Sequence, residues 1–162
     1  MNVEKVLFPQ SDWVPNNQRF PVLLYRAAML DCQSSDFEHT FARNGWTGIW
    51  RNGVFDYQHY HSGAHEVLGV GRGNATLLIG GPTGKAFDSS TGDCLILPAG
   101  TGHRKLLSSP DFQVVGAYPP GQHADIQTEA ASPEMQEVIS SLPLPDTDPL
   151  FGANGGVLEA WR

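Results

Sequence analysis

Residues 56–70 read DYQHYHSGAHEVLGV. Side chains alternate between the two faces of an extended strand, so His59 and His61 share one face. In the apolar run that follows, Glu66, Leu68 and Val70 share a face for the same reason. If the two faces coincide, two imidazoles and one carboxylate converge on a single point. That combination of ligand types is typical of a divalent metal site.

A fourth candidate ligand lies in residues 92–103, which read GDCLILPAGTGH. A short apolar strand ends at Pro98, a glycine-containing turn follows, and His103 begins the next segment. Proline cannot continue a strand interior, and glycine permits the tight turn. The segment therefore returns a third histidine toward the same region of the chain.

The two stretches together resemble the paired motifs of the cupin superfamily. The first cupin motif is His-x-His, three or four residues, Glu, six residues and Gly, and it is matched here by His59, His61, Glu66 and Gly73. The second is Gly, five residues, Pro-x-Gly, two residues, His, three residues and Asn, and it is matched by Gly92, Pro98, Gly100 and His103. The sequence departs from the second motif at Leu107, which stands in place of Asn. The flanking sequences are similar to those of an uncharacterised bacterial subfamily of single-domain cupins.

The resemblance implies an all-β fold, the cupin double-stranded β-helix or jelly-roll barrel, with two short flanking helices. It implies one domain over residues 1–162, with a motif core at about 54–118, N-terminal strands and a helix in 1–53, and a C-terminal helix and tail in 119–162. It also implies that His59, His61, Glu66 and His103 ligate a divalent transition metal (Fe, Mn, Ni, Cu or Zn).

The pattern of turn residues predicts short strands at regular spacing, as in a sandwich or barrel. They are expected at 54–61, 66–71, 75–80, 86–90, 94–97, 103–107 and 112–118. Strands at 3–8 and 20–26 are expected at a sheet edge or crossing to a partner subunit. A helix is predicted over 35–44, with Ser35 and Glu38 spaced as a capping box. A second helix should run from Pro133 to about Leu142, followed by a tail without regular structure.

Composition narrows the class of protein. The chain carries a formal net charge of −7, which opposes electrostatic binding to nucleic acid or anionic membranes. It has no apolar run long enough for a membrane span and no secretory signal pattern at its start, so we expect a cytoplasmic protein. The two cysteines, Cys32 and Cys94, do not form a disulfide framework.

Several residues near the motifs remain open in role. His65 adjoins Glu66 and points away from the metal on a regular strand, whereas a turn at 62–64 would swing it inward to replace a ligand. Arg104, or its neighbour Lys105, faces either the pocket mouth or the solvent. Parity with the histidines places Phe55 and Tyr57 in the pocket wall, and Tyr118 is a further pocket candidate.

Three functions follow from the resemblance and the ligand types. The first is a metal-dependent enzyme, an oxygenase, isomerase or decarboxylase, that acts on a small oxygen-chelating metabolite. The second is a non-catalytic module that binds or senses a small ligand, and the third is a metal-free structural cupin. We also expect a homodimer, because a small double-sheet barrel leaves strand edges exposed. The apolar strand at 22–24 and the tryptophans Trp46 and Trp50 are the surfaces expected to form its interface. For the tryptophans, core or interface packing is favoured over stacking on a substrate.

Overall fold

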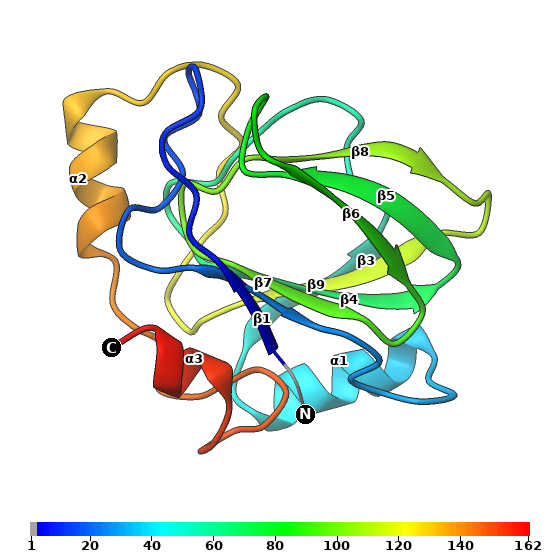
Figure 1. Cartoon of the computed structure of the whole chain (residues 1–162). Coiled ribbons are helices and arrows are strands. Elements are labelled where there is room, and N and C mark those ends of the chain that lie inside the picture. Colours follow the sequence, from blue (N-terminus) through cyan, green and yellow to red (C-terminus); the bar gives the residue numbers. More distant parts are fainter. Residues whose placement is uncertain (1–2) are drawn as a thin grey trace.

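The computed structural model describes residues 3–162 and contains two antiparallel sheets with three short helices (Figure 1). The six-stranded sheet has the order β1-β2-β7-β4-β9-β3 and the three-stranded sheet has the order β6-β5-β8. The strands are β1 (Val3–Val6), β2 (Val22–Tyr25), β3 (Thr47–Asn52), β4 (Glu66–Arg72), β5 (Asn74–Ile79), β6 (Lys85–Ser90), β7 (Cys94–Leu97), β8 (His103–Ser108) and β9 (Gln113–Tyr118). The helices are α1 (Ser34–Arg43), α2 (Pro133–Ser141) and α3 (Gly156–Ala160).

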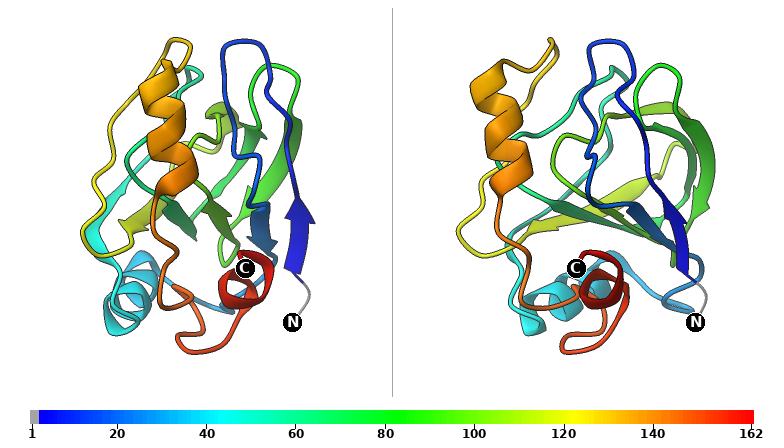
Figure 2. Two further views of the ribbon diagram at one scale, coloured as in Figure 1. Left: turned by 90° about the vertical axis from the view of Figure 1, so that its left-hand side faces the viewer. Right: turned by 60° about the vertical axis from the view of Figure 1, so that its left-hand side comes forward.

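Strand β4 shows why the central strands read as nearly continuous apolar runs. Leu68 and Val70 face the interior between the two sheets, where they join one buried cluster. Val67 faces the other way, into a second buried cluster that contains Phe37 of α1 and Trp161 beyond α3. Helices α1 and α3 lie under the outer face of the six-stranded sheet (Figures 1 and 2). Because both faces of the sheet are covered, the side chains on both faces of β4 are buried. Glu66 lies on the same face as Leu68 and Val70, which is the face between the two sheets.

Most elements fall where the sequence predicts them, and the all-β double-sheet fold is confirmed. The N-terminal strands pair along one edge of the six-stranded sheet, with β1 on β2 and β2 on β7. Helix α2 begins as expected, because the Ser132 hydroxyl accepts a hydrogen bond from the Met135 backbone N–H at 3.1 Å. The capping box of α1 was placed two residues too late, since Asp36 accepts from the Gln33 N–H at 2.8 Å.

Two sequence predictions about regular structure are wrong. The segment 54–61 is not a strand of either sheet; it meets β8 through an isolated bridge between His59 and His103 and through a hydrogen bond from the Lys105 N–H to the Phe55 carbonyl at 2.9 Å. The tail contains the short helix α3, whose neighbour Trp161 is fully buried and anchors it. Burial against the sheet, which local sequence does not report, explains this last difference.

The surfaces predicted for a dimer interface are largely interior. Val22, Leu23, Leu24 and Trp46 are buried within the chain itself. They therefore cannot form the expected interface without unfolding this region, and the homodimer stays a prediction without an assigned surface. Among residues 3–162, no helix combines the length and the apolar character needed to cross a membrane.

Candidate metal centre

The loop before β4 brings two of the predicted ligands against the start of β8. His59 and His103 exchange backbone hydrogen bonds, with N···O distances of 3.2 and 2.9 Å. The Gly100 N–H donates to the His61 carbonyl at 2.7 Å. Gly100 has a φ of +89°, and a Cβ there would lie 2.6 Å from the Asn16 carbonyl oxygen, so the turn requires glycine. These contacts fix the two motifs beside each other.

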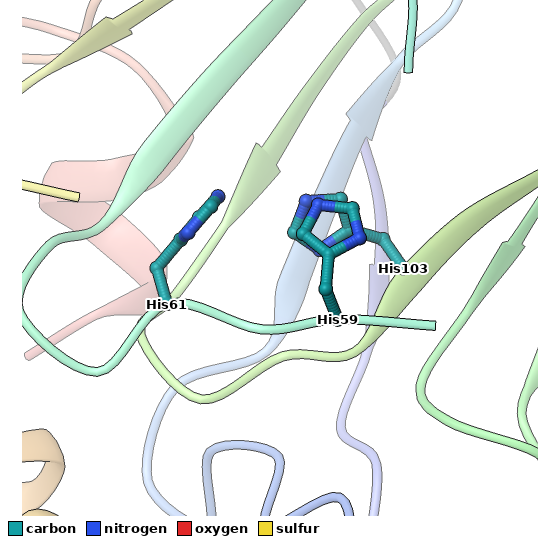
Figure 3. A group of neighbouring side chains, drawn as sticks. All are labelled: His59, His61 and His103. Atoms are coloured by element: carbon teal, nitrogen blue, oxygen red, sulfur yellow. The ribbon is translucent and has the colours of Figure 1, made fainter. Parts of the chain in front are cut away.

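The side chains of His59, His61 and His103 form one buried cluster (Figure 3). One ring nitrogen from each lies within 4.8 Å of the others. The Nδ1 atoms of His59 and His103 each lie 3.0 Å from the carbonyl oxygen two residues earlier, of Tyr57 and Thr101 respectively.

His61 follows the same rule with a more distant partner, because its Nδ1 contacts the carbonyl oxygen of Asp125. A carbonyl oxygen only accepts, so Nδ1 carries the proton in all three rings and Nε2 is left with a lone pair. Three imidazoles thus present the same unprotonated nitrogen to one point. This arrangement can hold a divalent metal ion, with the carbonyls orienting the ligands.

Glu66, at the first position of β4, lies beside two of the three histidines. Its Oε1 atom lies 3.2 Å from Nε2 of His61 and 3.5 Å from Nε2 of His103. Oε1 is buried, and no described residue donates an aligned hydrogen bond to it. Oxygen and nitrogen lone pairs at this distance repel unless a proton or a cation lies between them. The residues therefore fit a cation, and they supply three nitrogen atoms and one oxygen atom for it.

The charges of the site are coupled. Burial raises the pKa of Glu66, but the positive charge of His61 and the contacts of both histidines outweigh it, and the net pKa is lowered. Burial alone lowers the pKa of His61, but the charge of Glu66 overrides it and raises the pKa to about 9. For His59, burial and the neighbouring charge of His103 lower the pKa to about 3. Without a metal, the Glu66 carboxylate therefore favours a second proton on His61, at the Nε2 atom that faces it.

The cluster lines a cavity of about 460 Å³. Its wall is built mostly by β3, by the loop after it and by the segment after β9, and it consists of Trp50, Arg51, Asn52, Gly53, Val54, Phe55, His59, His61, Glu66, Leu68, His103, Tyr118, Ala124 and Ile126. The Tyr118 hydroxyl accepts a hydrogen bond from Trp50 Nε1 at 2.8 Å. Burial raises the pKa of Tyr118, and the adjacent Glu66 raises it further. Tyr118 therefore stays protonated and offers its hydrogen to Glu66 or to a ligand.

Some of the other pocket candidates line the cavity, and others lie outside it. Phe55 lines the cavity, whereas Tyr57 stacks on Phe55, with ring centroids 4.9 Å apart, and is not part of the wall. Arg104 follows the inward-facing His103 on β8, so it faces the other way and is absent from the wall. Tyr118 lies in the wall, and so does Trp50, for which core or interface packing was the favoured expectation.

His65 points away from the cluster, as strand alternation predicts. Its Nδ1 accepts a hydrogen bond from the Ala99 N–H at 2.9 Å. Its ring packs on Trp161 and Phe20, with centroid distances of 5.0 and 6.0 Å. Burial lowers its pKa to about 4, so the ring is neutral. Its Nδ1 lone pair is already used by the backbone, which leaves His65 outside the group that could hold a metal.

Comparison with known proteins gives one informative relative. No protein-family model matches the chain. The uncharacterized protein YjlB of Bacillus subtilis (strain 168) is 40% identical over 156 residues, which cover 95% of this chain and 93% of the relative. The chain belongs to the same family as YjlB. Its two histidine-bearing motifs meet at one cavity between two antiparallel sheets, so the chain has the double-sheet fold that the cupin motifs predict.

Two solved structures also resemble this chain in fold. Acireductone dioxygenase from Bacillus anthracis, with a cadmium ion in its active centre, is 21% identical, with a TM-score of 0.36 over 57% of this chain and 59% of the dioxygenase. The epimerase RmlC from Legionella pneumophila is 14% identical, with a TM-score of 0.35 over 82% of this chain and 75% of the epimerase. The chain thus spans less than two thirds of the length of the dioxygenase.

One residue that organises the site of this chain escaped the sequence analysis. The Asp125 carboxylate accepts hydrogen bonds from the backbone N–H groups of Ser62 and Gly63, both at 2.8 Å, and from the Ser62 hydroxyl. Gln127 Nε2 donates to it at 2.8 Å. Burial raises the pKa of Asp125, but these donors outweigh it and lower the pKa. Asp125 lies outside both motifs, and no local pattern in the sequence marks it.

Proposed function

We propose that His59, His61, Glu66 and His103 bind one divalent transition metal ion, and that this cupin is a metal-dependent enzyme acting on a small oxygen-chelating metabolite. The observation that carries the proposal is the common tautomer of the three histidines. Each Nδ1–H is spent on a carbonyl oxygen, so all three Nε2 lone pairs are free. Those of His61 and His103 lie 3.2 and 3.5 Å from Oε1 of Glu66, which is buried and lacks a hydrogen bond from any described residue.

The ligand set also supports the kind of ion and the kind of substrate. Three neutral imidazoles and one carboxylate suit Fe(II), Mn(II), Ni(II), Cu(II) or Zn(II). One anionic ligand leaves a net positive charge of about +1 on the complex, which favours an anionic oxygen donor. A bound ion supplies Lewis acidity that polarises a chelating oxygen and stabilises negative charge on it. The Tyr118 hydroxyl, beside Glu66 in the same wall, is placed to donate a hydrogen bond to such an oxygen.

A specific feature of the wall favours a second function, a module that binds or senses a ligand without turnover. Apart from the four proposed ligands, Tyr118 and Arg51 are the titratable side chains in the wall. Tyr118 has a raised pKa and Arg51 is paired with Glu38, so neither is poised as a general base near neutral pH. Turnover of chelating metabolites by protein loaded with each of the five metals distinguishes the two functions. Binding without conversion across the panel supports the module.

Metal binding itself is tested by elemental analysis of protein purified without chelator. We expect one divalent ion per chain in the wild type and almost none in His61→Ala. Metal should also raise the melting temperature, because a ligand that binds only the folded state stabilises it by about 3 kcal/mol at a hundredfold excess over its dissociation constant. If neither metal content nor the melting temperature responds to chelator, the protein is a metal-free structural cupin and the proposal is wrong.

A further inference from the structure

We propose that the cavity selects molecules with one anionic chelating head and an uncharged apolar body, and that it rejects molecules carrying a second anionic group, such as a phosphate, on that body. The inference rests on the proposed metal function, because the metal holds the chelating head. It adds the class of substrate, which the ligand set alone does not give.

The wall beyond the proposed ligands is largely apolar. Trp50, Val54, Phe55, Leu68 and Ile126 supply two aromatic and three aliphatic side chains to a cavity of about 460 Å³. Burial of an apolar group against these side chains is favourable, because it removes apolar surface from water. The same side chains offer no hydrogen bond to a charged group. The body of a bound molecule therefore meets hydrocarbon on several sides.

Among the wall residues, Arg51 is the one side chain with a fixed positive charge. Its guanidinium is already paired in a two-point contact with the Glu38 carboxylate, through Nε at 2.9 Å and through the NH2 nitrogen. Glu38 belongs to α1, which covers the outer face of the sheet, so the pair draws the Arg51 charge toward that side. A second anion in the cavity would have to share this guanidinium with Glu38, because two of its three nitrogens already face that carboxylate.

Asn52, the polar wall residue next to Arg51, carries no charge, so it offers an anion only a neutral amide donor. The Oδ1 atom of Asn52 accepts the Gly53 backbone N–H at 2.8 Å. Tyr118 is beside Glu66, so its hydroxyl serves the metal end of the cavity. An anion on the body of a ligand would lose its water without a compensating partner, which is strongly unfavourable. A neutral apolar body avoids this loss.

Binding of three hydroxamates to zinc-loaded protein, measured by calorimetry, tests the inference without any enzyme assay. Acetohydroxamate has the chelating head alone, benzohydroxamate adds an apolar ring, and 4-carboxybenzohydroxamate adds an anion to that ring. We expect the ring to tighten binding by about ten- to a hundredfold, as expected for burial of an aromatic side chain. We expect the carboxylate to remove most of this gain.

The outcomes separate the inference from the function beneath it. If benzohydroxamate binds no better than acetohydroxamate, or if the carboxylated ring binds as tightly as the plain one, the inference is wrong while the metal site stands. Failure of all three hydroxamates to bind protein that holds zinc also overturns it. A protein that holds no zinc overturns the proposed function, and the inference falls with it.

A matched pair of variants tests the missing charge directly. Ile126 lines the cavity and is 52% exposed, whereas Val138 on α2 lies outside it and is 44% exposed, so both positions tolerate lysine. Ile126→Lys should tighten binding of the carboxylated ring, relative to that of benzohydroxamate, at least about tenfold, since it supplies a partner for the anion. Val138→Lys adds the same net charge and should change neither. Equal effects of the two variants would mean that general charge, and not the cavity wall, sets the preference.

Discussion

His61 and His65 are four residues apart, both are buried, and they have opposite chemical roles. The Nδ1–H of His61 donates a hydrogen bond to the Asp125 carbonyl, and its Nε2 faces Glu66. His65 uses its Nδ1 lone pair to accept the Ala99 N–H, and its ring packs on Trp161. The difference teaches that burial does not identify a metal ligand. The backbone partner of each ring does, because it decides which nitrogen keeps a free lone pair.

The largest effect on metal binding and stability should come from replacing the two histidines, His61 by alanine and His65 by asparagine. His61→Ala removes a lone pair and should abolish metal binding. His65→Asn keeps an acceptor near the position of Nδ1 but loses the aromatic packing, so it should keep the metal while lowering the free energy of unfolding by about 2 kcal/mol. Elemental analysis and denaturant unfolding measure the two properties separately. Loss of metal in His65→Asn would contradict the division of roles.

Asp125 provides the next test, because it holds the His61 side of the cluster from outside both motifs. Asp125→Ala removes four hydrogen bonds to the 62–63 turn and Gln127, and it loosens the carbonyl that orients His61. Loss of a residue that orients a metal ligand weakens metal binding by about ten- to a hundredfold. The matched control is Asp146→Ala, an exposed aspartate outside the cavity wall. Titration with a competing chelator measures both, and equal affinities would show that Asp125 does not position His61.

The strands and the identity of the histidine-bearing segments could be predicted from sequence, because each rests on local information. Alternation along β4 correctly set Glu66, Leu68 and Val70 on one face and His65 on the other. The segment 54–61 was predicted as a strand from its pattern, but too few of its backbone groups find partners in either sheet.

The elements that were missed depend on contacts between distant parts of the chain. Trp50 faces the cavity because β3 pairs with β9, and Trp46 is interior because its indole N–H donates to the Thr147 carbonyl at 3.2 Å. Asp125 meets the 62–63 turn across more than sixty positions of sequence, as its sequence separations of 62 and 63 show. No short window of sequence contains either pairing, so spacing rules could not find them.

The protonation of the cluster predicts a pH effect of intermediate size. Because the charge of Glu66 raises the pKa of His61 to about 9, metal binding between neutral pH and about pH 9 displaces one proton. The apparent affinity should therefore rise about tenfold per pH unit in this range. Calorimetry in buffers of different ionisation enthalpy counts the released proton. A pH-independent affinity in the wild type would contradict the assignment of the proton to His61.

In metal-free protein, the raised pKa of His61 makes the stability of the fold decrease as the pH rises, whereas the metal affinity increases over the same range. A histidine whose folded pKa lies above its unfolded value of 6.5 contributes stability below pH 6.5, and this stability is lost as the pH rises through about 9. The neutral His65, with its pKa lowered to about 4, contributes in the other direction, because its stability is present above pH 6.5 and is lost as the pH falls toward 4. Melting curves of chelated wild type, His61→Ala and His65→Asn should show the two windows separately. An alkaline decline that persists in His61→Ala would disprove this explanation.

The smallest effect should come from Tyr118, which touches the cluster without belonging to it. Tyr118→Phe keeps the ring in the wall but removes the acceptor of the Trp50 Nε1–H and the hydroxyl beside Glu66. Leaving one buried donor without a partner costs about 1–3 kcal/mol of stability, whereas the metal keeps all four ligands, so its affinity should change only a few-fold. The Trp50→Phe variant provides the control, because it removes the donor and leaves the Tyr118 hydroxyl in place. If Tyr118→Phe lowers the metal affinity as strongly as Asp125→Ala does, the hydroxyl holds Glu66 in its binding position. In that case Trp50→Phe, which leaves the hydroxyl in place, should keep the metal affinity of the wild type.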